Sequence, residues 1–241
     1  MGKFQFHYSG SELLERLNKS MAIFSIKSLA RSDESEVKMT DHIAMLLGEW
    51  IHISQHPGTS RKVQAKFLKA ICSQGLLNSD TVTPLFFRVS IGLVIDSFSG
   101  KDPVPPPHFL AIDNFAKLIV QLVLYHADST NSDFDSARIV LFNRFLSVLV
   151  LMLVHSHEKA GHRFNQRPFL RLYSSILNEL KTLQLEFGSL YIHIISSIGN
   201  SLYTLQPSFV PGFTFGWVQL ISHRHFMPSL LLTGDKKVLF T

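Results

Sequence analysis

Apolar residues recur at helical spacing along nearly the whole chain, and the alternating pattern of a half-buried strand is almost absent. The pattern predicts helices at residues 11–31, 41–56, 63–71, 78–97 (with its start at residues 78–80), 109–126, 136–154, 168–183, 189–205 and 213–226. Between them we expect loops at 31–39, 100–107, 127–135 and 158–167. Because successive helices pair about every 45 residues, we predict an all-α, HEAT-like helical-repeat solenoid of about eight to nine helices.

Composition restricts the protein class further. Apolar residues make up 46% of the chain, and charged residues only 17%, against about 25% in typical soluble domains. This balance excludes a disordered chain, which needs low hydrophobicity and many charges. The single cysteine, Cys72, excludes a disulfide framework and any zinc module built from several cysteines. Because Cys72 follows the apolar Ile71, we interpret it as a packed thiol and not as a nucleophile.

The net charge of +5 arises from 23 basic and 18 acidic residues spread along the chain. The densest basic groups are Arg61, Lys62, Lys66 and Lys69, and then Arg163, Arg167 and Arg171. Both groups have helical spacing and are not consecutive runs, so solvated helix faces are the favoured interpretation. Direct nucleic-acid binding is not expected. The alternative is a helical-repeat adaptor that binds RNA or another protein through these basic faces.

Two apolar stretches raise the question of a membrane. Residues 139–154 are interrupted by Asn143, Arg144 and Ser147, and a span needs about 20 apolar residues. We therefore predict a buried core helix there. Residues 187–223 contain no Lys, Arg, Asp or Glu, but Gly and Pro divide them. We interpret them as a buried helical pair and expect no membrane partner.

Motifs that would carry chemistry are missing from the sequence. His157 and His162 flank Glu158, but they are five residues apart, whereas the zinc-protease signature places its histidines four apart. There is also no phosphate-binding loop and no Gly-x-Ser-x-Gly elbow. We therefore predict a non-enzymatic protein without cofactor or bound metal. A metal-dependent enzyme using the His-rich segment 155–162 stays open as an alternative.

Several motifs in the last third of the chain are more specific. Residues 164–172 read FNQRPFLRL, residues 210–213 read VPGF, and residues 217–228 read WVQLISHRHFMP. In this order they resemble the C-terminal domain of the large NOT scaffold subunit of the CCR–NOT mRNA deadenylase complex. The resemblance extends more loosely back to about Asp41 and forward to Leu232.

This resemblance implies a scaffold segment that docks the NOT-box subunit heterodimer and supports mRNA deadenylation, decay and translational repression. It also implies a role in transcription regulation, a cytoplasmic and nuclear location, and peptide motifs of RNA-binding repressors as further partners. The motif residues become candidates for partner binding or for the family's structural motif. They are Asn165, Arg167, Pro168, Arg171, Pro211, Gly212, Phe213, Trp217, His223 and Arg224.

We divide the chain into a leading helix with a charged loop at 1–40, the NOT-like helical domain at 41–232, and a divergent tail at 233–241. Relatives of this family continue with further helices after the segment that corresponds to 227–232. The resemblance therefore implies a domain truncated at its C-terminus, with an apolar end face. We place His223, Arg224 and His225 in the last predicted helix, and expect Asp113 to pair with Lys117 one turn further along its own helix.

Overall fold

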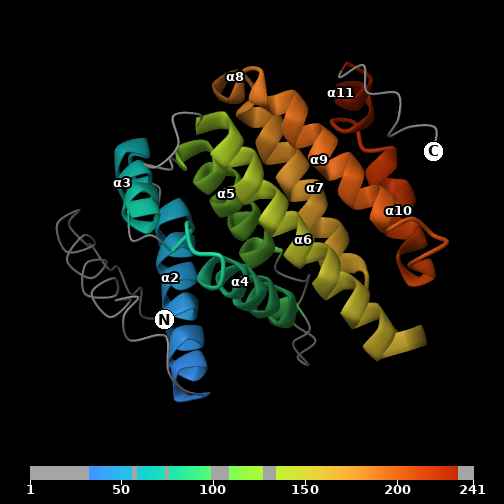
Figure 1. Ribbon diagram of the computed structural model, residues 1–241, viewed down its shortest axis with the longest axis horizontal. Coiled ribbons are helices and arrows are strands. Elements are labelled where there is room, and N and C mark those ends of the chain that lie inside the picture. The colour runs from blue at the N-terminus through green and yellow to red at the C-terminus, as the bar shows by residue number, and fades with distance from the viewer. Residues whose placement is uncertain (1–32, 56–58, 74–75, 99–108, 127–133, 233–241) are drawn as a thin grey trace, which may run out of the picture.

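A computed structural model describes residues 33–55, 59–73, 76–98, 109–126 and 134–232 (Figure 1). These residues form ten α-helices and two 3₁₀ turns, Gly161–Arg163 and Pro211–Phe213, and contain no strand. The helices are α2 (Asp33–Gln55), α3 (Arg61–Ser73), α4 (Val82–Phe98), α5 (Leu110–Tyr125), α6 (Phe134–Ala160), α7 (Arg167–Thr182), α8 (Gln184–Phe187), α9 (Leu190–Thr204), α10 (Thr214–Ile221) and α11 (Met227–Leu232). The all-α prediction is confirmed. The predicted helix 11–31, the loop 100–107 and the tail 233–241 lie outside the described residues.

The helices stack in two layers, as expected for a HEAT-like solenoid. One layer contains α2, α4, α6, α9 and α11, and each of these helices contacts the next in that order. The other layer contains α3, α5, α7 and α10, again with contacts between neighbours. Consecutive long helices thus alternate between the layers, and the array extends from α2 and α3 on the left of Figure 1 to α10 and α11 on the right.

The core lies between the layers, around α5 and α6. α5 is buried on most of its circumference because it contacts helices of both layers. α6 buries Phe142, Phe145, Leu149 and Leu153. Among the described residues, only the span containing α6 is long and apolar enough to cross a membrane. Its buried face packs on α4 and α9, which confirms the predicted core helix.

Some sequence-based boundaries are wrong. The predicted loop at 31–39 is helical from Asp33 onward, where the sequence supplies the acidic residue types that helix N-termini favour. Helix α6 begins at Phe134 and continues to Ala160, so the loops predicted at 127–135 and 158–167 are shorter. The helix predicted at 213–226 ends at Ile221, and residues 223–225 form the connection to α11. The buried pair predicted at 187–223 holds for α9 but not for α10, whose outer face is exposed.

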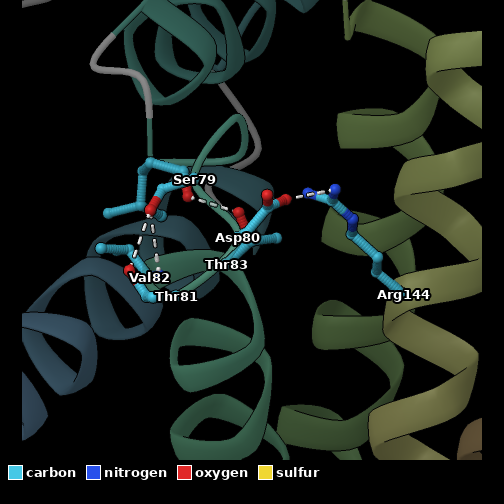
Figure 2. A network of polar contacts seen from close by, with 7 residues as sticks. Ser79, Asp80, Thr81, Val82, Thr83 and Arg144 are labelled. Carbon is cyan, nitrogen blue, oxygen red and sulfur yellow. Dashed lines mark hydrogen bonds and ion pairs between the residues drawn. The ribbon is translucent and has the colours of Figure 1, made fainter.

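The start of α4 agrees with the sequence. The Ser79 hydroxyl accepts a hydrogen bond from the backbone N–H of Val82 at 3.2 Å (Figure 2). The Ser79 carbonyl accepts a second one from the N–H of Thr83 at 3.1 Å. Serine is a preferred residue for satisfying the free N–H groups at a helix start. The predicted helix start at residues 78–80 is confirmed.

Candidate partner-binding surface

A hydrogen bond links the last turn of α6 to the 3₁₀ turn that precedes α10. The backbone N–H of Gly212 donates to Nε2 of His157 at 3.2 Å. The His157 ring also packs edge-on against Phe164, with ring centroids 5.5 Å apart. The hydrogen bond requires an unprotonated Nε2. His157 therefore serves as an internal acceptor that positions the Pro211–Phe213 turn.

Two further hydrogen bonds hold α10 in place. The Gln166 side-chain oxygen accepts from the N–H of Gly216 at 2.6 Å. The indole N–H of Trp217 donates to the carbonyl of Leu202 on α9 at 2.8 Å. We call the His157–Gly212 and Gln166–Gly216 contacts the C-terminal junction. This junction explains why the FNQRP and PGF motifs occur together, although more than forty residues separate them in the chain.

The junction requires glycine at two positions. A Cβ added at Gly212 would overlap the His157 ring, and one at Gly216 would overlap the ring of Phe213. Phe213 is fully buried, so it has little room to move away. These two glycines allow backbone and rings to approach closely, and a larger residue at either position would force a neighbouring ring or the backbone to shift.

The ten predicted site residues divide by exposure. Pro168 and Phe213 are buried, Arg171, Gly212, Trp217 and His223 are half-buried, and Asn165, Arg167, Pro211 and Arg224 are exposed. Arg171 binds Asp113 of α5 within the chain. The structure therefore brings the motif together mainly as a structural unit, with four side chains facing outward. Whether these contact a partner stays a prediction.

The outer face of α10 was missed as a candidate. Phe215 is 61% exposed and Val218, one turn further on, is 50% exposed. Residues three apart lie on one side of a helix, so the two form an apolar strip that we call the α10 face. Gln166, the residue between the exposed Asn165 and Arg167, bonds to Gly216 of α10. The sequence does contain a sign of this face, because the apolar residues Phe215 and Val218 lie on the side of the helix opposite the buried Leu220.

The connection after α10 contains two histidines, His223 and His225, whose pKa values are lowered. The pKa of His223 is lowered by burial and by the positive charges of His225 and Arg224. The pKa of His225 is lowered by burial, by Arg224 and by Lys181. The N–H of His225 donates to Nδ1 of His223 at 3.3 Å. Both rings therefore favour the neutral form, and protonation of His223 at Nδ1 would break this hydrogen bond.

Among the described residues, the His-rich segment forms no metal-binding cluster and the basic groups form no continuous surface. No three His, Cys, Asp or Glu side chains there are placed to hold a metal ion. The exposed lysines of α3, which are Lys62, Lys66 and Lys69, lie at the left of Figure 1. Arg163 and Arg167 follow α6, which ends at the lower right. The two basic groups are therefore far apart.

Stacked helix pairs define a helical-repeat fold, and the α10 face is its candidate interaction surface. Residues 177–239 match the Not1 family model, described as "CCR4-Not complex component, Not1". The resemblance inferred from the sequence is thereby confirmed over these residues.

Named relatives agree with this assignment. General negative regulator of transcription subunit 1 from Schizosaccharomyces pombe is 29% identical over 94% of this chain, and the match covers 11% of that protein. The protein of the same name from Saccharomyces cerevisiae is 29% identical over 82% of the chain, which is 10% of its own length. The chain thus spans about a tenth of these curated relatives.

Solved structures give the same fold. The NOT1 superfamily homology domain from Chaetomium thermophilum aligns with a TM-score of 0.68 and 29% identity, covering 83% of this chain and 38% of that one. A Not1 C-terminal domain in complex with Not4 aligns with a TM-score of 0.68 and 27% identity, covering 83% and 41%. The helical-repeat prediction is confirmed by these neighbours.

Proposed function

We propose that this chain is a non-enzymatic scaffold segment that docks the NOT-box subunit heterodimer of the CCR–NOT complex. Through that contact it supports mRNA deadenylation, decay and translational repression, in the cytoplasm and the nucleus. The observation that carries the proposal is its likeness, along 83% of its length, to a Not1 C-terminal domain solved in complex with Not4. Peptide motifs of RNA-binding repressors are a second class of partner in the same proposal.

The α10 face is the docking surface in this proposal. Its apolar strip, Phe215 and Val218, is exposed, and so are Asn165 and Arg167, the chain neighbours of the Gln166 that bonds to Gly216 of α10. Protein interfaces combine an apolar centre with a polar rim, and aromatic residues and Arg are enriched in them. In the C-terminal junction the backbone N–H groups of Gly212 and Gly216 donate to the side chains of His157 and Gln166, which holds α10 in place. A rigid surface lowers the entropic cost of binding.

The test is a co-expression pull-down of the full chain with the paired NOT-box subunits. We expect wild type to retain both subunits, and Phe215→Ala/Val218→Asp to lose them. A matched control is Leu185→Asp on α8, where the exposed leucine is far from the α10 face. Its binding should equal wild type. If wild type binds neither subunit, the docking proposal is wrong. If the α10 variant binds like wild type, the docking surface lies elsewhere.

A further inference from the structure

The outward side of α3 carries a row of lysines, which we call the α3 row. It consists of Lys62, Lys66 and Lys69, and all three side chains are exposed. Because they lie at i, i+4 and i+7, they follow one line along the helix. From the first to the last the helix rises about 11 Å, at about 1.5 Å per residue. The buried residues of α3 occupy the other side, where the helix packs on α2 and α5.

No acidic side chain pairs with the α3 row among the described residues. Helix α3 contains neither Asp nor Glu, so the pairing of opposite charges one turn apart along a helix does not occur in it. Neither the ion pairs nor the side-chain hydrogen bonds of the described residues involve a lysine of α3. The positive charge of the row is therefore compensated by solvent and not by the fold.

Arg61 is not counted in the row, because it lies beside acidic residues of other helices. It lines a hollow of about 230 Å³ between α3, α5 and α7, together with Lys117, Glu179 and Glu186. Two cations and two carboxylates balance there. Neighbouring residues of a helix point about 100° apart, so Arg61 faces this hollow while Lys62 faces outward. The unbalanced charge of α3 belongs to the three lysines alone.

The α3 row suits an acidic protein segment better than a nucleic acid. Surfaces that bind single-stranded nucleic acid combine a long basic track with aromatic side chains on which bases stack. The aromatic residue of α3, Phe67, is 2% exposed, and the exposed Arg163 and Arg167 lie far from α3 (Figure 1). Carboxylates on one side of an extended segment repeat about every 7 Å, so two or three of them match a row about 11 Å long.

We propose that the α3 row binds an acidic segment of a partner protein, with Glu or Asp at alternate positions over about six residues. Exposed ion pairs are weak singly and are screened by salt. The row therefore contributes to the rate and orientation of association more than to its affinity. In Figure 1, α3 and α10 lie at opposite ends of the array. This site does not depend on docking at the α10 face, and either proposal can fail alone.

The probe is a fluorescein-labelled peptide of alternating Glu and Ser, titrated by anisotropy with the full chain in about 50 mM salt, where charges are little screened. We expect Lys66→Glu/Lys69→Glu to weaken binding at least about fivefold, because two attractions become repulsions. The neutral variant Lys66→Gln/Lys69→Gln should weaken it by a smaller factor. The matched control is Lys159→Glu/Arg163→Glu, which reverses two exposed cations at and after the end of α6 and gives the same net charge. Its affinity should change by less than about twofold.

A charge exchange makes the test specific to the row. A peptide of alternating Lys and Ser should bind Lys66→Glu/Lys69→Glu more tightly than it binds the control variant, because the attraction is restored with both signs reversed. Unchanged melting curves of these surface variants exclude misfolding as the cause of lost binding.

Three results would overturn the proposal. The first is no binding of the Glu–Ser peptide to wild type at low salt. The second is equal weakening by the row variant and the control variant, since binding would then follow net charge and not the row. The third is a uridine oligonucleotide that binds wild type more tightly than the peptide and is lost in the row variant, since the row would then be a nucleic-acid surface.

Discussion

Arg171 on α7 binds the carboxylate of Asp113 on α5 through two hydrogen bonds, Nε to Oδ1 at 2.7 Å and Nη2 to Oδ2 at 2.6 Å. Ser175, one turn further along α7, donates to the same carboxylate at 2.6 Å. The guanidinium carbon also lies 4.8 Å from the ring centre of Phe109. The expected pairing of Asp113 with Lys117 is therefore wrong, because the planar fork of Arg171 matches both carboxylate oxygens. This motif residue links two neighbouring helices of one layer.

The Arg171–Asp113 pair should make a modest, measurable contribution to stability. Its side chains are 42% and 36% exposed, and solvent screening reduces the value of such pairs, so we expect a coupling of about 1 kcal/mol. The measurement is urea unfolding of Arg171→Ala, Asp113→Ala and the double variant. A double-variant loss smaller than the sum of the single losses supports the pair. Simple additivity would show that the contact contributes nothing.

Gly212→Ala should destabilise the C-terminal junction. The added methyl group overlaps the His157 ring, so either the ring moves or the Gly212–His157 hydrogen bond breaks, at a cost of about 1–3 kcal/mol. Gly48→Ala is the matched control, since a Cβ there meets nothing within 4 Å and alanine favours a helix by up to about 1 kcal/mol. Thermal melting checks both. In a His157→Ala background the Gly212→Ala cost should shrink, and an unchanged cost would contradict the proposed clash.

Helical periodicity was enough to predict the fold class, because the apolar spacing reports which side of each helix faces the core. The predicted helix 63–71 has Phe67 and Ile71 one turn apart on one side, and both are buried. Periodicity could not show that Lys117 would be half-buried on α5, since that depends on which helices are stacked against it. Short elements such as α8 and α11 were missed because four or six residues carry too little periodicity.

The candidate surface was only partly predictable. The motif containing Gly212 and Trp217 pointed to the right region, but sequence alone does not separate residues that shape a junction from residues that face solvent. Phe213 and Phe215 are two apart and chemically identical, yet one is fully buried and the other exposed. Phe213 ends a 3₁₀ turn whose Gly212 N–H donates to His157 of another helix. Such long-range contacts leave no local signal in the sequence.

Acidification should weaken the folded state through the turn after α10. Burial and nearby positive charges lower the pKa of His223 below its ordinary value near 6.5, so below that pH the unfolded chain binds more protons than the folded one. The contribution of neutral His223 to the free energy of unfolding is fully present above about pH 6.5, and it is lost as the pH falls through the folded-state pKa. We expect the unfolding free energy of wild type to fall between about pH 7 and pH 5, and His223→Gln/His225→Gln to show a smaller fall. An equal fall in both proteins would contradict this assignment.

Cys72 should react slowly with thiol reagents while the chain is folded. Burial raises the pKa of this thiol from 9.0 to about 11, and because only the thiolate is the nucleophile, its population near neutral pH falls about 100-fold. The chain contains no other cysteine, so the colour change with Ellman's reagent reports this site alone. We expect a native rate at least about 100-fold below the rate in guanidinium, where the thiol is fully solvated. Equal rates in the folded and unfolded chain would show that α3 does not bury Cys72 and would remove the basis for interpreting it as an inert, packed thiol.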